Sequence, residues 1–203
     1  DTNSYGTVEF ECLPRLVKTH KEYSPRAFGR QRCIYLYRHP GDVMLSYHAY
    51  LSARRDSSFR ETSLSEFIRD PDVGLAAWGD HVQSWLRRAD VVTTYEHLKD
   101  DAVVEMQRVL ESLNLDHVEP EVVRTAVSRS TFEKVRQAEE RSGRHDEERF
   151  DSNFKFTRSG TVGQWRDTMS ESDLEYLNGF MKRRGLQSLY RKGPMASQGN
   201  RDR

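Results

Sequence analysis

The 203-residue sequence predicts an α/β fold in which a parallel sheet is covered by helices on both faces. Three short apolar or β-branched stretches, each bounded by polar or turn residues, are predicted to be buried strands: residues 15–18 (RLVK), 33–37 (CIYLY) and 91–94 (VVTT). Their nearly continuous apolar character suits a parallel sheet better than a half-exposed antiparallel one. Helical patterns lie between and after these strands, and this alternation is typical of an α/β fold.

The helices are predicted from apolar spacing and from capping residues. Ser63 is an N-cap candidate for a helix over residues 64–68, and the last helix begins at Ser170 with a sequence that resembles a capping box. The other helical segments are residues 42–51, 75–86, 103–113, 121–127 and 132–138.

Two polar stretches are expected to be mobile. Residues 139–152 contain one apolar side chain, that of Phe150, and residues 191–203 form a polar tail. The first stretch is open to two interpretations, a lid that orders on ligand binding or an ordinary solvated loop. We therefore divide the chain into one domain, residues 1–190, and a tail, residues 191–203.

The composition disfavours several classes of partner. Lys plus Arg and Asp plus Glu number 32 each, and this balance argues against a nucleic-acid polymer or an anionic membrane as the main partner. The sequence has no apolar run of about 18 residues and no signal-peptide pattern at its start. Cys12 and Cys33 lack motif spacing, and the seven histidines lack metal-ligand spacing. We predict a cytoplasmic protein with reduced cysteines and no metal site.

The strongest chemical signal is the segment YLYRHPGDVMLSYHAY at residues 35–50. A strand ends at Tyr37, and Arg38 then precedes a His-Pro-Gly turn and a helix. A cation at the carboxyl end of a strand lies where parallel α/β sheets bind ligands, and the guanidinium fork suits phosphate. Ser46, on the helix, can add a hydroxyl. The alternative is that Arg38 pairs with a local carboxylate such as Asp42 and that Ser46 faces the core.

The second signal is the loop TRSGTVGQW at residues 157–165. Two glycines, hydroxyl side chains and an arginine in one loop can present backbone N–H groups to an anion. Glycine permits close approach because it has no Cβ. An ordinary glycine-rich surface loop is the alternative.

The third signal is RLVKTH at residues 15–20, where a strand delivers Lys18 and His20 to its carboxyl end. A histidine there is placed to act as a general base, because its pKa lies near the operating pH. The alternative is a structural or exposed histidine.

The fourth signal is aromatic. Tyr95 follows the strand VVTT, and Phe132 follows Ser130 and Thr131 at the start of a helix. Each ring can stack on a purine or meet its edge. The alternative is that both rings fill the core.

The order of these four segments resembles the sulfotransferase family, and its cytosolic type in particular. Lys18-Thr19-His20, and Arg38 with Ser46 eight residues later, match the family's lysine-threonine-histidine strand end and its arginine, proline turn and helical serine. Further matches are Tyr95-Glu96-His97-Leu98, Thr131-Phe132, Arg158-Ser159-Gly160 and Gly163-Gln164-Trp165. Each motif alone is weak, but five in the same order over about residues 14–185 are specific.

The resemblance implies a P-loop-NTPase-like, doubly wound parallel sheet and a sulfotransferase activity. Such an enzyme transfers a sulfuryl group from 3′-phosphoadenosine 5′-phosphosulfate (PAPS) to a hydroxyl or amine of a small-molecule acceptor and leaves adenosine 3′,5′-bisphosphate (PAP). By the resemblance, Arg38, Ser46 and Arg158 hold the 3′-phosphate, together with backbone N–H groups around Ser159 and Gly160.

The resemblance also assigns the adenine contacts and the base. Tyr95 and Phe132 would hold the adenine, with Thr131 nearby. His20 would take the proton from the acceptor as it attacks sulfur in line, and Lys18 would help to stabilise the leaving bridging oxygen. Such a reaction depends on positioning and charge stabilisation more than on covalent chemistry.

The family's first strand and its loop have no match in this sequence. That loop resembles Pro-Lys-Ser-Gly-Thr-Thr-Trp and cradles the 5′-phosphosulfate. Loss of a central strand would leave unpaired backbone edges and an uncovered core. We therefore expect residues upstream of Asp1 in the natural protein, or a homo-oligomer or partner chain that supplies the strand. Ser159 and Gln164 stand where lysine and aspartate are usual, and Ser159 weakens the charge of the phosphate site.

Two other functions stay open. A non-catalytic domain would keep the half-site for the 3′-phosphate and bind 3′-phosphoadenosine nucleotides. A different phosphate-handling α/β enzyme, such as a kinase, is disfavoured because the sequence has no G-x-x-x-x-G-K-S/T loop and no clustered carboxylates for Mg²⁺.

Overall fold

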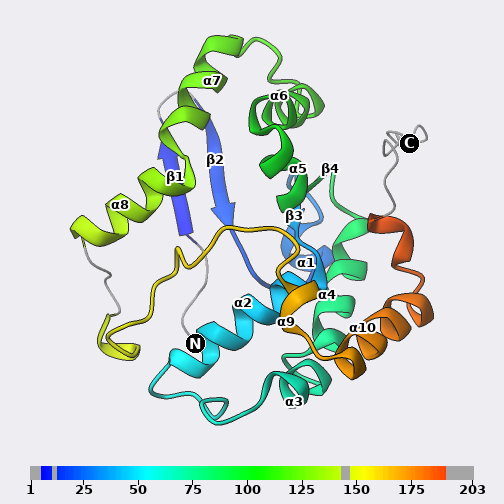
Figure 1. Ribbon diagram of the computed structural model, residues 1–203. Coiled ribbons are helices and arrows are strands. Elements are labelled where there is room, and N and C mark those ends of the chain that lie inside the picture. The colour runs from blue at the N-terminus through cyan, green and yellow to red at the C-terminus, as the bar shows by residue number, and fades with distance from the viewer. Residues whose placement is uncertain (1–5, 11–12, 143–146, 191–203) are drawn as a thin grey trace.

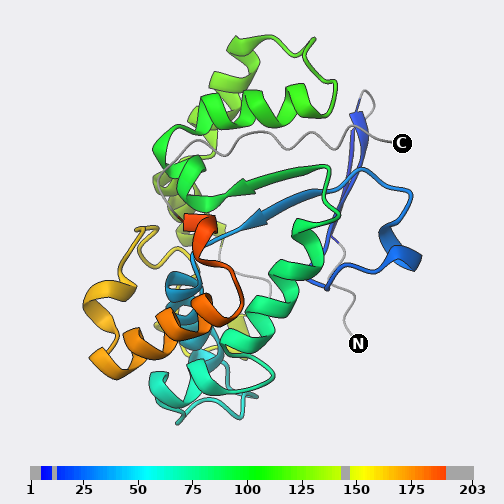
Figure 2. The same ribbon diagram turned by 90° about the vertical axis from the view of Figure 1, so that its right-hand side faces the viewer.

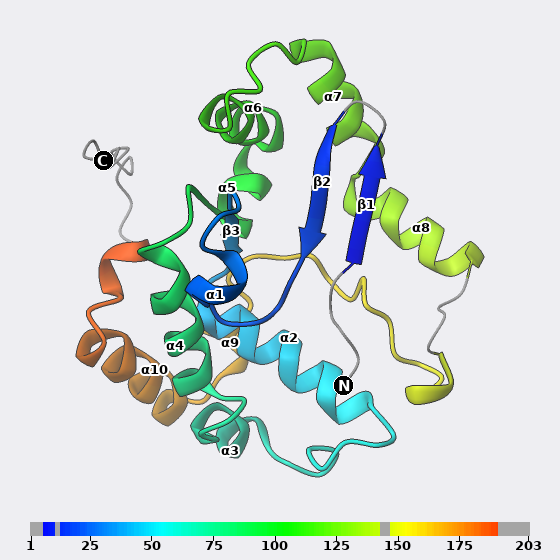
Figure 3. The same ribbon diagram turned by 180° about the vertical axis from the view of Figure 1, so that it is seen from behind.

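The fold is given by a computed structural model, which describes residues 6–10, 13–142 and 147–190. Within these ranges four strands form two separate pairs (Figure 1). β1 (Gly6–Phe10) and β2 (Leu13–Lys18) are antiparallel, whereas β3 (Ile34–Tyr37) and β4 (Val91–Thr94) are parallel. Figure 3 shows β1, β2 and β3 from behind.

The prediction that residues 15–18 join the parallel sheet is wrong. β2 pairs with β1 in a hairpin, with Gly6 opposite Lys18 and Phe10 opposite Leu13. The physical reason is proximity in sequence, because neighbouring strands pair after closing only a short loop, at a small entropic cost. The other two predicted strands do form a parallel pair, in which Tyr37 lies opposite Thr94.

Helices flank the β3–β4 pair. Figure 2 shows β3 and β4 side by side between α6 on one side and α4 on the other. The helices are α1 (Pro25–Phe28), α2 (Pro40–Ala53), α3 (Leu64–Arg69), α4 (Leu75–Leu86), α5 (Tyr95–Asp100), α6 (Ala102–Ser112), α7 (Pro120–Arg129), α8 (Phe132–Ser142), α9 (Trp165–Thr168) and α10 (Glu171–Arg183), with 3₁₀ turns at Glu147–Arg149 and Gln187–Tyr190.

The predicted helices are all present, and α1, α5 and α9 were not predicted. These three are short, at four to six residues, so they carry little periodic signal. Ser63 caps α3 as predicted, in a capping box with Glu66. Ser170 caps α10 and accepts a hydrogen bond from the backbone N–H of Asp173.

The main core lies between β3, α2, α4 and α10. Tyr35 and Tyr37 are buried on the face of the sheet that α4 covers, and Tyr35 stacks on Trp85 with ring centroids 5.8 Å apart. Trp78 and Val82 of α4 lie in the same core. This packing fixes the carboxyl end of β3 relative to α4.

The opposite face of the sheet is covered unequally. α6 covers β4, where the hydroxyl of Thr93 donates a hydrogen bond to the buried carboxylate of Glu105. On β3, Ile34 and Leu36 are 44% and 51% exposed. Sheets of this class usually have helices over both faces, so in the described part of the chain β3 lacks its second cover.

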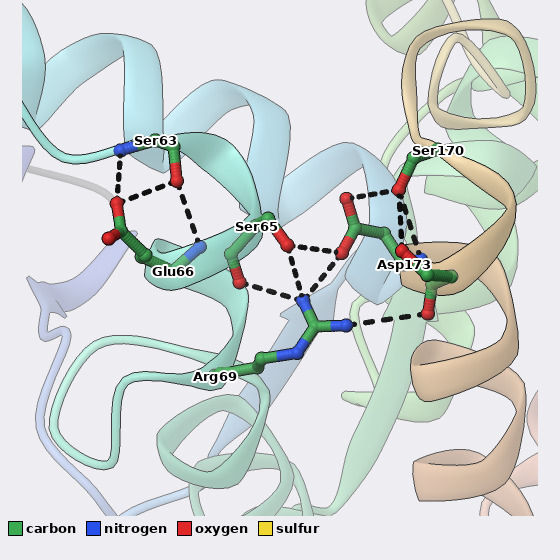
Figure 4. A network of polar contacts seen from close by, with 7 residues as sticks. Ser63, Ser65, Glu66, Arg69, Ser170 and Asp173 are labelled. Carbon is green, nitrogen blue, oxygen red and sulfur yellow. Dashed lines mark hydrogen bonds and ion pairs between the residues drawn. The ribbon is translucent and has the colours of Figure 1, made fainter.

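A polar network joins α3 to α10 (Figure 4). The carboxylate of Asp173, which is almost fully buried, accepts hydrogen bonds from Arg69, Ser65 and Ser170. Burial alone would favour the neutral acid, but these hydrogen bonds outweigh it and lower the pKa of Asp173 below its ordinary value. The network therefore joins α10 to α3 through an ionised carboxylate that several hydrogen bonds satisfy.

The expectation that residues 139–152 are mobile is wrong at both ends. Residues 139–142 belong to α8, and Phe150 is buried at 1% exposure. The backbone N–H of Asp151 donates to the carbonyl O of Ala53 at 2.9 Å, which ties this segment to the end of α2. Residues 143–146 and the tail, residues 191–203, lie outside the described residues.

Two further features bear on the sequence predictions. Within the described ranges, no helix combines the length and the apolar character needed to cross a bilayer. Cys33 is a free thiol, and Cys12 lies outside the described residues.

Candidate functional site

The structure brings Arg38, Ser46 and Arg158 together on one cavity of about 330 Å³. Arg38 follows the last residue of β3, Ser46 lies on α2, and Arg158 lies in the segment before α9. Aromatic side chains and a lysine line the rest of the cavity: Tyr47, Tyr50, Phe154, Phe156 and Lys155. A wall with cations and a hydroxyl beside an aromatic wall suits a phosphorylated ligand with an apolar part.

Arg38 is held from several directions. Its Nη2 donates to the carbonyl O of Thr161 at 2.6 Å and lies 3.4 Å from a carboxylate oxygen of Asp42. Its guanidinium lies 4.4 Å from the ring centroid of Tyr95. Its Nε is buried and has no hydrogen-bond partner among the described residues. Arg38 therefore both pairs with Asp42 and lines the cavity. The alternative that Ser46 faces the core is wrong, because Ser46 is exposed.

The start of α2 explains why Arg38 has this position. Pro40 occupies the first turn of α2, and the ring Nδ1 of His39 accepts a hydrogen bond from the backbone N–H of Gly41 at 3.1 Å. His39 also stacks on Trp165, with ring centroids 4.4 Å apart, and burial lowers the pKa of His39 to about 4. A glycine is needed at position 41 for Trp165 to stack on His39, because a Cβ at Gly41 would lie 2.4 Å from Cγ of Trp165.

The glycine-rich loop is built onto α2. The carboxylate of Asp42 accepts a hydrogen bond from the backbone N–H of Gly163 at 2.7 Å, and Gly163 has a φ of +87°. Ser159 donates through its hydroxyl to the amide oxygen of Gln164 at 2.7 Å. These contacts distinguish the loop from an ordinary surface loop, because a buried carboxylate fixes its backbone.

The predicted adenine residues gather around Gly160. The hydroxyl of Tyr95 donates to the carbonyl O of Gly160 at 3.1 Å. Gly160 has a φ of +62°, and a Cβ there would lie 2.6 Å from the ring of Phe132, so that ring packs directly on the glycine. Thr131 is exposed, and its hydroxyl accepts from the backbone N–H of Lys134 at 3.4 Å. Tyr95, Phe132 and the Gly160 loop are therefore neighbours.

Lys18 and His20 lie away from this cavity. Lys18 is the last residue of β2, and both side chains are exposed. Partial burial, followed by the charge of Lys18, lowers the pKa of His20 below its ordinary value. The backbone of His20 lies close enough to the ring of His81 on α4 to act on the pKa of His81, and His81 lines a second cavity of about 260 Å³. Arg38 and Tyr95 line that second cavity too, whereas Lys18 and His20 do not.

A sequence model described as "Sulfotransferase domain" matches residues 3–192. The chain belongs to the sulfotransferase family.

Known proteins of the family show the same relationship. The chain is 30% identical to Sulfotransferase 1 family member D1 from Rattus norvegicus over 187 residues, which are 86% of this chain and 63% of that protein. It is 28% identical to Cytosolic sulfotransferase 12 from Arabidopsis thaliana over 188 residues, which are 84% of this chain and 56% of that protein. The chain thus spans less than two thirds of the length of these curated relatives.

Solved structures with 21% identity show the same fold. A retinol dehydratase in complex with androsterone and the inactive cofactor PAP has a TM-score of 0.65 over 84% of this chain and 51% of that chain. A mouse sulfotransferase complexed with PAP has a TM-score of 0.61 over 75% of this chain and 58% of that chain. The predicted α/β fold is therefore confirmed as the fold of the sulfotransferase family.

Two residues of this sulfotransferase-family chain were missed by the sequence reasoning. Lys155 lines the Arg38 cavity, and its Nζ lies 2.9 Å from the carboxylate of Glu140 on α8. His81 lies three residues after Trp78 and four before Trp85, so it belongs to the apolar face of α4. A polar residue on an apolar helix face was a signal that could have been used for His81. For Lys155, the only signal in the sequence was its closeness to Arg158.

Proposed function

We propose that this chain acts in sulfuryl transfer from PAPS to a hydroxyl or amine of a small-molecule acceptor. The observation that carries the proposal is the shared cavity of Arg38, Ser46 and Arg158, three side chains that come from three separate segments. Two guanidinium groups and a hydroxyl around one cavity fit a dianionic 3′-phosphate, because charge-assisted and bidentate hydrogen bonds are strongest with such oxygens.

The residues present fit one half of the nucleotide. The buried Nε of Arg38 has no partner among the described residues, and a phosphate oxygen would satisfy it. Lys155 adds a cation on the same cavity. Tyr95 and Phe132, which meet at Gly160, would hold the adenine, with Thr131 near the edge, and the backbone of Ser159 and Gly160 would add donors.

His20 and Lys18 would serve the reacting end. The nucleotide supplies the sulfuryl group, whose bond to the bridging phosphate oxygen breaks as the acceptor oxygen or nitrogen bonds to sulfur. In this proposal His20 takes the acceptor's proton; a neutral imidazole is the required form, and the lowered pKa of His20 favours it. Lys18, at the end of the same strand, would stabilise the charge on the leaving oxygen.

Thermal melting with PAP, and with AMP for comparison, tests the nucleotide proposal. At about 100 times the Kd, PAP is expected to stabilise the fold by about 2.7 kcal/mol, or roughly 5–10 °C in Tm. AMP lacks the 3′-phosphate and should give little shift. Equal shifts with both nucleotides, or none with either, would contradict the 3′-phosphate site.

A second candidate function is binding of 3′-phosphoadenosine nucleotides without catalysis. It rests on the same observation, the cavity that Arg38, Ser46 and Arg158 share, because such a cavity can bind a 3′-phosphate without turnover. The two functions differ in turnover. Release of PAP from PAPS in the presence of phenol or amine acceptors supports the first, and tight PAP binding without release supports the second.

We propose further that a strand from another polypeptide segment pairs with the edge of β3 that faces away from β4. The support is structural, because no strand in the described ranges pairs with that edge and Ile34 and Leu36 are exposed beside it. A second copy of this chain or a different partner chain would cover the edge.

Light scattering tests the homo-oligomer. A dimer that Leu36→Lys converts to a monomer is the expected result, because Leu36 is exposed on β3. A monomer at all concentrations would contradict self-association.

We also propose that residues 1–190 form one domain and that residues 191–203 form a tail. A cytoplasmic location is proposed as well, and similarity to a protein named as a cytosolic sulfotransferase supports it.

A further inference from the structure

α4 presents several side chains to the loop that follows β2. The indole Nε1–H of Trp85 donates to the carbonyl O of Lys21 at 3.0 Å, and the hydroxyl of Ser84 accepts from the backbone N–H of Tyr23 at 3.1 Å. That hydroxyl is itself fixed, because it donates to the carbonyl O of His81 at 2.7 Å. The ring of Tyr23 meets the ring of Trp85 edge-on, with centroids 5.3 Å apart. The loop is therefore held at residues 21 and 23 by one face of α4.

His81 faces the same loop. Its ring Nδ1 lies 3.0 Å from the hydroxyl of Tyr35 on β3, and a neutral ring with its proton on Nε2 can accept from that hydroxyl. Burial lowers the pKa of His81 and so favours the neutral form, against the charge of Glu22 and the nearby backbone of His20 and Lys21, which act to raise the pKa. His81 therefore joins α4 to β3 and lies beside the backbone of His20.

This attachment matters because β2 is not part of the parallel sheet. β2 pairs only with β1 among the described strands, so the β3–β4 pair does not fix where His20 begins. α4 is packed on β3 through Tyr35 and Trp85, and β3 leads directly into Arg38. α4 is therefore the element that connects the position of the Arg38 cavity to the position of His20.

We propose that His81, Ser84 and Trp85 are positioning residues that hold the His20 backbone at a fixed place relative to Arg38. The inference rests on the role given to His20 in the proposed function. A general base must lie within hydrogen-bond reach of the proton that it takes, so a base on an unattached loop would lose most of its effect.

The test is nuclear magnetic resonance on the full ¹⁵N-labelled chain, with Ser84→Ala and Trp85→Phe as the variants. Ser84→Ala removes the acceptor of the Tyr23 N–H, so hydrogen exchange at that amide should become roughly fivefold to tenfold faster. In both variants the loop is released, and the pKa of His20, read from its ring resonances, should rise toward 6.5. Gln83→Ala is the matched control, because the adjacent Gln83 donates instead to the carbonyl O of Arg184, at 3.2 Å.

Different results would contradict this inference and the proposed function. If Ser84→Ala and Trp85→Phe leave Tyr23 exchange and the His20 pKa as they are in Gln83→Ala, the positioning role is overturned. If Trp85→Phe does not fold, Ser84→Ala decides alone. PAP affinity should be the same in Ser84→Ala as in the unchanged chain, since none of the residues proposed to hold PAP is altered. Failure of the unchanged chain to bind PAP would instead contradict the proposed function while leaving the loop measurement valid.

Discussion

The Arg38 cavity and the His20 loop differ in how the fold holds them. Arg38 is fixed by the carbonyl of Thr161, by the buried carboxylate of Asp42 and by the ring of Tyr95, which come from three segments. His20 is exposed on a loop that one helix, α4, holds by its backbone. Arg38 of the proposed phosphate site is therefore fixed against the packed part of the fold, whereas the proposed base depends on a surface attachment.

This difference indicates which part of the site tolerates change. Groups in a packed, low-dielectric region interact strongly with their neighbours, so a single substitution there affects both binding and stability. Groups on an exposed loop affect position and rate with little effect on stability. The four predictions that follow test this contrast in order of decreasing effect.

Replacement of Arg38 should have the largest effect. Arg38→Met is expected to weaken PAP binding roughly 100-fold, or by about 3 kcal/mol, because a bidentate charge-assisted contact is lost. Isothermal titration calorimetry measures the change. Arg60→Met is the control, because the pair of Arg60 with Asp151 is on the surface. Unchanged affinity in Arg38→Met would show that the cavity is not the phosphate site.

The pH dependence of stability should come more from His39 than from His20. The pKa of folded His39 is about 4, below its ordinary 6.5, so between these values the unfolded chain binds a proton that the folded chain does not. The contribution is fully present above pH 6.5 and is lost as the pH falls toward 4, by up to about 3 kcal/mol.

Urea unfolding between pH 7.5 and pH 4 measures this contribution. His39→Asn should flatten the curve, since asparagine can still accept the Gly41 N–H at an N-cap. His20→Asn should flatten the curve less than His39→Asn does, because the His20 side chain is exposed. An equal flattening in both variants would remove the contrast between the two regions.

Gly41 and Gly179 form a matched pair for packing. A Cβ at Gly41 would lie 2.4 Å from Cγ of Trp165, whereas a Cβ at Gly179 would lie 3.0 Å from the flexible end of Arg183. Gly41→Ala should lower stability by about 1–2 kcal/mol and Tm by roughly 3–6 °C. Gly179→Ala should be neutral or slightly stabilising, because it lies within α10. A neutral Gly41→Ala would mean that the His39–Trp165 region is less tightly packed than the contacts indicate.

Lys155 should have the smallest effect. It is half exposed and paired with Glu140, so Lys155→Met should weaken PAP binding by about 0.5 kcal/mol, or roughly twofold, at low salt. The difference should vanish at about 1 M salt, where exposed charges are screened. A difference that persists at high salt would place Lys155 in the packed part of the site.

The sequence by itself determined the local elements of this protein. The strand before Arg38, the helix that carries Ser46 and the capped starts of α3 and α10 follow from apolar spacing, proline and serine positions, which act over a few residues. The family motifs also identified Arg38, Ser46 and Arg158, which line the cavity, and Tyr95 and Phe132, which pack at Gly160. In these segments local preference and the final fold agree.

Only the tertiary structure decided the pairing of β2, the burial of Phe150 and the role of α4. A four- to six-residue apolar stretch fits a parallel or an antiparallel neighbour equally well, and the choice depends on which edge is available. The hydrogen bond from Trp85 to Lys21 joins residues that are 64 positions apart in the sequence. The hydrogen bond between Asp42 and Gly163 joins residues that are 121 positions apart. Such contacts leave no periodic trace in the sequence, because they depend on how separate elements pack and not on the residues beside them.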